Sequence, residues 1–448
     1  MHENSSQNMK FHTSVFIFTR DLRVVDNVGL IEACKNSDLV IPCFIMNPKI
    51  IKGKSYRLQF LLDCIEDLKR EFVRKKSTLH ILHGSYAQIL QKIDKLKKID
   101  AVFANQDFTP FAKNRQEQIT QFCITNNIPF HQYVDHLMYD PNIIKTQQEK
   151  PYTIFSQFFR TAIQIPVGKP QQNNFTNFHT RLLDDHIITS DQIIPIRGGR
   201  KNALQILKNI KDFSDYETKR NYPAYQTTML SAHNRFGTIS IRELYHTISE
   251  KLGIHHTLMN EIHWREFFSH VLYHFPQVSK RAFRQNCSNI PWKYNKIHID
   301  AWKNGRTGFP IVDAGMRELN NTGFMHNRIR MVVASFLSKD LHIDWKIGER
   351  YFAEKLIDYD LAVNNGNWQW AASTGCDAQP WFRIFNPWRQ QKKFDSECKY
   401  IKKWIPELEK LSADQIHNLE TESFDVDYPR PIVDHSEESK LAKQMFQH

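Results

Sequence analysis

The most informative stretch of the sequence is Asp358–Trp370, which spells DYDLAVNNGNWQW. Two acids, several amides and two tryptophans make it too polar for an ordinary core helix. On a helix, Asp360 and Asn364 share a face, whereas Trp368 and Trp370 lie about 200° apart and serve different surroundings. One indole would face a buried cofactor and the other a cleft. No histidine lies at a ligand spacing from these carboxylates, so we expect no metal.

A second helical pattern lies upstream, in Asn260–Phe268. Glu261, Trp264, Arg265 and Phe268 follow the i, i+3, i+4, i+7 spacing and share one helical face. An acid, a cation and two aromatic rings on one stripe suit a pocket for a planar polar ligand. The alternative is a surface ion pair beside core aromatics.

A third pattern lies in Phe324–Val333. On a helix, Asn327 and Met331 stack on one face with Arg330 adjacent, and Arg328 points elsewhere. An amide, a thioether and two guanidinium groups beside an apolar helix can contact bases and phosphates.

The charge balance favours a polyanionic partner. Sixty Lys and Arg face 48 Asp and Glu, a net charge of +12, although a basic enzyme without such a partner is an equal alternative on charge alone. Cations alternate with amides and aromatics in Arg383–Lys393, and again in Ser279–Arg284. These segments are typical of a rim that tracks phosphates, or else of a solvated charged face.

Length and composition set the class of protein. The chain has 448 residues, enough for about three domains or fewer. A hydrophobic fraction of 41% and a charged fraction of 24% are typical of globular proteins and exclude disordered, collagen-like and coiled-coil classes. Apolar runs are too short for a membrane span, the N-terminal segment lacks an apolar signal core, and the seven cysteines form no CxxC pair. We expect an intracellular protein without a membrane, metal or disulfide framework.

The first third of the chain predicts a parallel sheet covered by helices on both faces. Short apolar runs of strand type alternate with amphipathic segments. The predicted strands are 15–18, 39–45, 79–82 and 101–104, and the predicted helices are 27–36, 58–72 and 111–126. No GxGxxG loop is present, so the sheet lacks the usual dinucleotide phosphate loop.

The remaining chain changes character twice. Residues 140–200 are rich in Gln, Asn, Thr and Pro, which predicts a long connector. Strand alternation disappears after residue 201, and all nine tryptophans lie between Trp264 and Trp404. The predicted organisation is therefore an α/β, doubly wound, Rossmann-like domain at 11–139, a connector at 140–200 and a large all-helical domain at 201–448.

These motifs resemble the photolyase and cryptochrome flavoproteins, most closely the class I cyclobutane pyrimidine dimer photolyases. The resemblance runs from FTRDLRVVDN at 18–27 to YPRPIV at 428–433, and its most specific stretches are 291–351 and 358–404. It implies an N-terminal antenna domain and a helical domain that binds FAD in a folded shape.

The resemblance also implies the residues that would bind FAD. Asp360 would contact the flavin ring, Arg330 would pair with Asp358 beside it, and Asn364 would face its reactive nitrogen and favour the reduced state. The full set implied for the cofactor is Tyr216, Thr227, Thr228, Met229, Leu230, Ser231, Glu261, Arg265, Asn327, Arg330, Asp358, Tyr359, Asp360 and Asn364.

Three tryptophans resemble the family's electron-transfer chain. Trp368 would lie nearest the flavin, Trp345 in the middle and Trp292 at the surface. Indoles can carry a hole stepwise from a buried flavin to solvent. Ordinary core packing is the alternative.

UV-damaged DNA is the substrate that the resemblance implies. Trp264 and Trp370 would clamp a flipped-out pyrimidine dimer. Glu261 would hydrogen-bond a thymine carbonyl, and Asn327 and Met331 would complete the pocket. With Asn364, these residues form the expected catalytic set. The residues expected to contact DNA are Arg220, Glu261, Trp264, Arg265, Phe268, Asn327, Arg328, Arg383 and Gln390.

The implied activity is light-driven splitting of cyclobutane dimers. One electron from excited, fully reduced FAD opens the ring and then returns, so no net redox change occurs. Relatives that act on six-four photoproducts carry additional active-site histidines in the segment around Asn327. Here Asn327, Arg328 and Met331 occupy that stretch, which favours cyclobutane dimers.

A second chromophore, in the antenna domain, is also implied. Arg57 and the segment Asn105–Ala112 lie where contacts to it are expected. The family uses methenyltetrahydrofolate, a deazaflavin or a second flavin, and the sequence does not discriminate among them.

We expect a monomeric cytoplasmic enzyme that acts on nucleoid DNA. The first alternative is a cryptochrome, a blue-light photoreceptor without repair activity. The short segment after Pro431 argues against the long variable tail usual in that group. The second alternative is a basic nucleic-acid-binding protein without a flavin.

Overall fold

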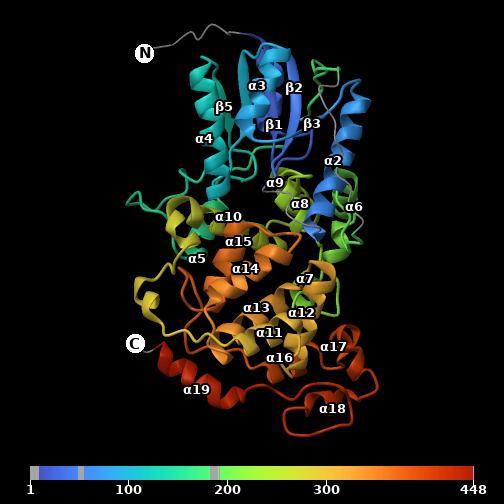
Figure 1. Ribbon diagram of the computed structural model, residues 1–448, viewed down its shortest axis with the longest axis vertical. Helices are drawn as coiled ribbons and strands as arrows, with labels where there is room; N and C mark the ends of the chain where they lie inside the picture. The colour runs from blue at the N-terminus through green and yellow to red at the C-terminus, as the bar shows by residue number, and fades with distance from the viewer. Residues whose placement is uncertain (1–9, 49–54, 182–189, 191, 447–448) are drawn as a thin grey trace. The chain divides into compact units, whose positions relative to one another are not determined.

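The computed structural model describes residues 10–48, 55–181, 190 and 192–446 (Figure 1). The chain forms two compact units. The sheet unit comprises Met1–Ile144, Ile163–Lys211 and Leu230–His255, and the helical unit comprises Lys145–Ala162, Asp212–Met229 and His256–His448. The predicted boundaries at residues 139 and 200 stay predictions, and the two units are described separately below.

The sheet unit contains a five-stranded parallel sheet, which confirms the predicted fold class. Its order is β3-β2-β1-β4-β5. The four predicted strands are present, and β5 is an additional edge strand. The strands are β1 (Phe11–Phe18), β2 (Ser37–Met46), β3 (His80–His83), β4 (Ala101–Asn105) and β5 (Phe130–Tyr133).

Helices cover both faces of this sheet because both faces of its central strand are apolar. On β1, Val15 and Ile17 join a buried cluster with α3 and α4, whereas Phe16 and Phe18 point to the opposite face. The ring of Phe18 packs edge-on against Phe72 of α2, with ring centroids 5.9 Å apart. The helices of this unit are α1 (Val28–Asn36), α2 (Tyr56–Arg74), α3 (Tyr86–Leu96), α4 (Pro110–Thr125), α6 (Arg200–Lys208), α8 (Ser231–Phe236) and α9 (Ile241–Lys251).

A buried ion network joins the loops at the carboxyl ends of β1 and β5 to α9. Asp135 is fully buried and accepts from Arg23 at 2.7 Å and from Arg242 at 3.0 Å. Arg242 also pairs with buried Asp26 at 2.9 Å. Two guanidinium groups that share two buried carboxylates satisfy one another, which is the condition for keeping charge inside a protein.

The helical unit contains helices and no strands among its described residues, as predicted for most of this part of the chain. Residues 145–162, expected to belong to the connector, contribute helix α5 to it. Its α-helices are α5 (Phe155–Ala162), α7 (Tyr216–Lys219), α10 (Thr257–His274), α11 (Lys296–Asn304), α12 (Pro310–Thr322), α13 (Asn327–Ser335), α14 (Trp345–Lys355), α15 (Leu361–Ala371), α16 (Pro387–Phe394), α17 (Lys399–Trp404), α18 (Ala413–His417) and α19 (His435–Met445).

The core of the helical unit is built around large aromatic side chains. Trp302 is fully buried and donates its indole N–H to the carbonyl of Val333 at 3.1 Å. It also packs edge-on against Trp368, with ring centroids 6.2 Å apart. None of the helices in the described parts of the chain has the length and apolarity needed to cross a bilayer.

The ion network predicts a specific destabilisation. Asp135→Ala leaves two buried guanidinium groups short of an anion, so we expect a loss of about 3–5 kcal/mol in unfolding free energy at pH 7. Denaturant unfolding followed by circular dichroism measures it. Glu66→Ala is the control, because it removes an exposed pair with Arg70 that contributes about 1 kcal/mol or less.

The same network predicts how this loss depends on pH. Burial raises the pKa of Asp135, but Arg23 and Arg242 outweigh it and lower that pKa below its ordinary value. Such a carboxyl stabilises the fold above its unfolded pKa of about 3.9, and the stabilisation disappears as the pH falls through the folded pKa. Wild type and variant should therefore converge below about pH 4. A constant difference from pH 7 to pH 3 would contradict the assignment.

Candidate functional site

Helix α10 presents the first group of predicted site residues. Its Glu261 forms an ion pair with Arg220, which directly follows α7. Burial raises the pKa of Glu261, and the Arg220 guanidinium opposes that rise. Burial, followed by the nearby Glu261 carboxylate, also raises the pKa of Tyr216, which keeps its hydroxyl neutral. The structure thus brings Glu261 to Arg220, 41 residues earlier in the sequence, and close to Tyr216.

Trp264, on the same helix, is half-buried and has an aromatic partner that the sequence did not reveal. The ring of Phe155 lies parallel to the indole, with centroids 3.6 Å apart and an interplanar angle of 7°. Arg265, one residue further on, pairs with buried Glu266 at 3.0 Å. Phe155 was missed because it lies in the segment expected to be a connector.

Helix α15 carries the second group. Asp360 caps its N-terminus and accepts from the backbone N–H groups of Ala362 and Val363. The buried Asn364 amide donates to the Glu349 carboxylate at 2.9 Å and to the Glu349 carbonyl at 3.1 Å. Glu349 was not predicted, because it lies on α14 and no sequence pattern links it to Asn364 on α15.

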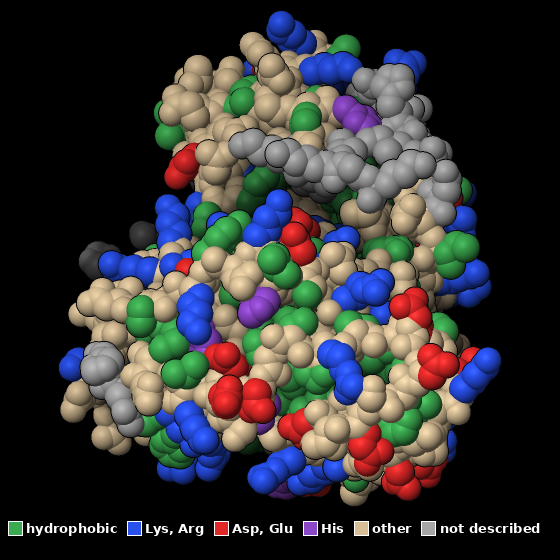
Figure 2. All heavy atoms as spheres, turned by 60° about the horizontal axis from the view of Figure 1, so that its bottom comes forward, with side chains coloured by type: hydrophobic (Ala, Val, Ile, Leu, Met, Phe, Trp, Pro, Cys, Tyr) green, Lys and Arg blue, Asp and Glu red, His purple; other side chains and the backbone are tan. Residues whose placement is uncertain are grey.

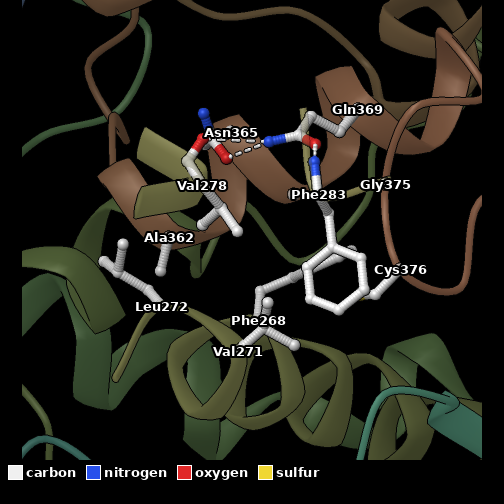
Figure 3. Close-up of a pocket in the computed structure, with 11 residues that line it drawn as sticks. Phe268, Val271, Leu272, Val278, Phe283, Ala362, Asn365, Gln369, Gly375 and Cys376 are labelled. Atoms are coloured by element: carbon white, nitrogen blue, oxygen red, sulfur yellow. Dashed lines mark hydrogen bonds between the residues drawn. The ribbon is translucent and has the colours of Figure 1, made fainter. Parts of the chain in front are cut away.

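Helices α10 and α15 pack directly against each other. A Cβ at Gly366 of α15 would lie 2.1 Å from the Phe268 ring of α10, so only glycine permits this approach. Gln369 fixes the neighbouring chain: its oxygen accepts from the Phe283 backbone at 2.8 Å, and its amide donates to Asn365 at 2.9 Å (Figure 3). Helices α10 and α15, which both carry predicted site residues, are therefore held close together.

Phe268 has a packing position in this arrangement. It is 5% exposed and lines a small, mainly apolar pocket between α10 and α15 (Figure 3). Of the residues predicted for the cofactor or for DNA, Phe268 is the one found in the lining. Its proposed contact with DNA stays a prediction.

The predicted pair of Arg330 and Asp358 is present. Arg330 of α13 donates to Asp358 at 2.9 Å and to the carbonyl of Met325 at 2.7 Å. The second oxygen of the Asp358 carboxylate is buried and has no hydrogen-bond partner among the described residues. A buried acceptor of this kind requires a donor from elsewhere, and a bound ligand would supply one.

The other polar residues at the start of α13 are more accessible. Asn327 is its first residue and is exposed, and Met331 is half-buried. Arg328 points elsewhere, as predicted: it donates to the Asn221 side chain after α7, and its guanidinium lies 4.5 Å from the ring centre of Phe394. The loop after α7 therefore contacts two predicted site residues. Its Asn221 accepts from Arg328, and its Arg220 pairs with Glu261.

The three tryptophans of the predicted chain belong to one packed core. Trp345 and Trp368 are each 2% exposed, and half-buried Trp292 packs against the same cluster, as does Trp370. Trp292 also meets Phe446 edge-on, with ring centroids 5.8 Å apart. Exposure separates Trp292 from the two buried rings, and the predicted order of Trp368 before Trp345 stays a prediction.

The predicted flavin turn is divided between the units. Thr227, Thr228 and Met229 belong to the helical unit, and Leu230 and Ser231 to the sheet unit. Met229 has a φ of 56°, which is unusual for a residue other than glycine. The role of this turn stays a prediction.

Residues predicted to contact an antenna chromophore have partners within the sheet unit. The Asn105 amide donates to Asp21 at 2.6 Å and to Asn27 at 2.8 Å. Burial raises the pKa of Asp107, but Arg20 and further cations outweigh it and lower that pKa to about 2. Asp107 is therefore anionic at neutral pH, and its contact with a chromophore stays a prediction.

Basic side chains are dispersed over the face seen in Figure 2, where Lys and Arg alternate with Asp and Glu. Of the predicted DNA-contacting residues outside α10 and α13, Arg383 is exposed and Gln390 is half-buried with a buried side-chain oxygen that lacks a partner.

The protein thus has a parallel-sheet unit and a helical unit. In the helical unit, the Asp358 carboxylate that pairs with Arg330 has one buried oxygen without a partner, which is typical of a ligand site. Two family models match the chain: "DNA photolyase" over residues 14–173 and "FAD binding domain of DNA photolyase" over residues 258–448. The chain belongs to the photolyase and cryptochrome family.

Individual relatives agree with this assignment. The chain is 35% identical to the deoxyribodipyrimidine photo-lyase of Synechococcus sp., with 96% of each chain covered. An archaeal photolyase from Sulfolobus tokodaii, solved with two FAD molecules, is 38% identical with a TM-score of 0.88, covering 97% of this chain and 99% of its own. A cryptochrome from Synechocystis is 26% identical with a TM-score of 0.87 and the same coverage. The resemblance to the photolyase and cryptochrome family is confirmed, and the assignment to class I stays a prediction.

FAD fits the residues of the helical unit. The unpartnered Asp358 oxygen offers an acceptor to the N–H edge of a flavin ring, beside the Arg330 cation. Arg265 is a further, half-buried cation, and Asn364 is a further buried amide. FAD is the cofactor that this domain binds.

Arg330→Ala tests that fit. It removes the cation from a carboxylate that is 9% exposed, so we expect FAD affinity to fall about tenfold or more, equivalent to about 1.4 kcal/mol. Flavin absorbance per protein and titration with FAD measure it. Arg306→Ala, at an exposed arginine of the same unit, is the control.

Adding Asp358→Asn to Arg330→Ala removes the uncompensated charge and should restore part of the folding stability lost in the single variant. Unchanged FAD affinity in Arg330→Ala would contradict the assignment.

Proposed function

We propose that this enzyme repairs DNA in a light-dependent reaction by splitting cyclobutane pyrimidine dimers. The observation that carries the proposal is the half-buried Trp264 indole beside the ion pair of Glu261 and Arg220, in a chain of the photolyase family. Binding of a flipped-out base requires an aromatic face on which it can stack and a nearby polar group that hydrogen-bonds to its edge.

DNA binding begins with the cations of the helical unit. Arg220 lies in the loop after α7 and pairs with Glu261 of α10, and Arg328 donates to Asn221 of the same loop. Arg383 and Gln390 would contact the strand on either side of the lesion, and Asn327 and Met331 would complete the pocket. Contacts with phosphates release counterions, so affinity should fall as the salt concentration rises.

Trp264 and Trp370 would enclose the extruded dimer. Ring stacking excludes water and contributes about 1–3 kcal/mol per base. Glu261 has a raised pKa, and in its protonated form it donates a hydrogen bond to a thymine carbonyl. That bond strengthens as the carbonyl gains negative charge, so Glu261 would stabilise the reacting state more than the bound substrate.

Bound FAD in its fully reduced form supplies, on light absorption, the electron that opens the cyclobutane ring. Asp358, Arg330 and Asn364 hold the polar edge of the cofactor pocket, and Tyr216, Tyr359, Asp360 and the turn 227–231 would hold the remainder. Around it, buried apolar side chains exclude water. A second chromophore would bind the sheet unit; the Sulfolobus relative contains two FAD molecules.

The tryptophans of the core would return bound FAD to its active state from outside the pocket. Trp368 and Trp345 are buried, and Trp292 reaches solvent. We place the enzyme as a monomer on the DNA of the cytoplasm.

Photoreception without repair, the cryptochrome alternative, predicts the same flavin but no loss of lesions. The similar proteins of Synechococcus sp. and Escherichia coli are both named deoxyribodipyrimidine photo-lyase, which favours repair. Purified protein, reduced and illuminated with blue light, should remove dimers from irradiated DNA. Flavin photochemistry without dimer loss would support the alternative.

Trp264→Ala should weaken binding to dimer-containing DNA about tenfold or more, because one stacking face is lost. Binding to a single-stranded oligonucleotide with one dimer, measured by fluorescence anisotropy, tests this. Trp404→Ala removes a partly buried indole of the same unit and is the control. Equal lesion affinity in Trp264→Ala and wild type would refute the clamp.

Trp368→Phe should slow photoreduction of the flavin at least tenfold and leave repair by pre-reduced enzyme intact. Absorbance under blue light with an external reductant measures the first, and dimer loss the second. Trp388→Phe is the control, because Trp388 is 3% exposed in the same core but lies outside the proposed chain. Loss of both activities in Trp368→Phe would contradict the assigned role.

A further inference from the structure

The partner of Trp264 comes from a segment outside the expected helical domain. Phe155 is the first residue of α5, and its ring covers the indole at a centroid separation of 3.6 Å and an angle of 7°. Such close, parallel packing occupies one face of the indole. A stacked base can then use only the opposite face.

The helical geometry of α10 shows which face Phe155 covers. At 100° per residue, Phe267 and His263 lie about 60° and 100° to one side of Trp264, whereas Glu261 and Phe268 lie about 60° and 40° to the other. Helix α5 contacts the first side: Phe155 packs against Phe267 at 5.9 Å, and Phe159 packs against His263 at 4.9 Å. Phe155 therefore covers the face turned away from Glu261.

Phe155 is also held in place from the far end of α15. Its backbone N–H, at the start of α5, donates to the Asp377 carboxylate at 2.9 Å. Asp377 follows Trp370 by seven residues in the loop after α15. Behind Phe155, α5 is anchored by Phe158, which is 1% exposed, and by fully buried Ala162. The first turn of α5 thus contacts Trp264 directly through Phe155. It is also hydrogen-bonded, through Asp377, to the loop that follows Trp370.

We propose that Phe155 is a positioning residue for lesion binding. It backs the Trp264 indole and fixes its plane, so that the face beside Glu261 is preorganised for the extruded dimer. A ring supported on one side loses less side-chain entropy when a base stacks on the other, and preorganisation of this kind raises affinity without a new contact to the ligand. The inference rests on the proposed function of Trp264.

The opposite arrangement, with Phe155 in the place of the substrate base, makes the contrary prediction. A base would then have to displace Phe155, and removing its side chain would strengthen binding. The packing of Phe155 against Phe267, a fully buried residue, and its backbone bond to Asp377 favour backing over occupancy.

The experiment measures binding of a single-stranded oligonucleotide with one thymine dimer, in the dark, to flavin-loaded Phe155→Ala, Phe155→Leu and Phe155→Tyr. We expect Phe155→Ala and Phe155→Leu to bind about three- to tenfold more weakly, because a stacked aromatic pair is lost. Phe155→Tyr, which keeps the flat ring, should bind like wild type. Affinity for the undamaged oligonucleotide and the rate of splitting at saturating DNA should stay within about twofold of wild type.

Two controls separate positioning from general destabilisation. Gln157→Ala alters the same helix at an exposed residue and should leave lesion affinity unchanged. In a Trp264→Ala background, Phe155→Ala should cause no further loss, since the ring it supports is absent. Phe155→Leu keeps the apolar volume, so its flavin content and Tm should match wild type even if Phe155→Ala folds poorly.

Wild-type affinity in Phe155→Leu, tighter binding, or an equal loss with and without Trp264 would overturn the proposal. Failure of the wild-type enzyme itself to bind or split dimers would instead overturn the proposed function. Loss of affinity in Phe155→Leu with recovery in Phe155→Tyr supports the inference.

Discussion

The close contact between helices α10 and α15 is the constraint on which the helical unit depends. The Phe268 ring packs directly on Gly366, and the Trp368 indole packs directly on Gly348 of α14. A Cβ at either glycine would lie 2.1 Å from the ring it faces. These two contacts set the spacing of three helices: α10 carries Glu261 and Trp264, α15 carries Asn364, Trp368 and Trp370, and α14 carries Trp345 and Glu349. Since packed interiors yield little, a methyl group at either glycine would displace side chains at the site as well as destabilise the core.

Most of the sheet could be predicted, because strands buried on both faces appear as continuous apolar runs. β5 could not: its sequence FHQY is half-buried at the edge of the sheet and carries no such run. Helix α5 was hidden for a different reason. Residues 140–200 are polar and proline-containing on average, and the eight residues that form α5 are stabilised by α10 and Asp377, which are distant in the sequence.

The site was predictable where its residues lie on one helix and obscure where they come from several. Periodicity placed Trp264 beside Glu261, and the resemblance paired Arg330 with Asp358, which the structure confirms at 2.9 Å. Glu349, Asn221 and Phe155 reach their partners across helix pairs and at sequence separations of 15, 107 and 109 residues, the first two by hydrogen bonds. No local pattern encodes such contacts, because they depend on helix packing that only tertiary structure fixes.

The concentration of tryptophan in the second half of the chain has two separate physical causes. Trp302, Trp345, Trp368 and Trp388 are at most 3% exposed and fill one core, where a large ring gains the most from burial. Trp264 and Trp370 are half-buried, so part of each ring is accessible and apolar surface is exposed to water in the free protein. That exposure is useful only if another flat apolar surface covers it. The backing of Trp264 by Phe155 then has a clear consequence: it covers one face of the indole and leaves the other face for a base.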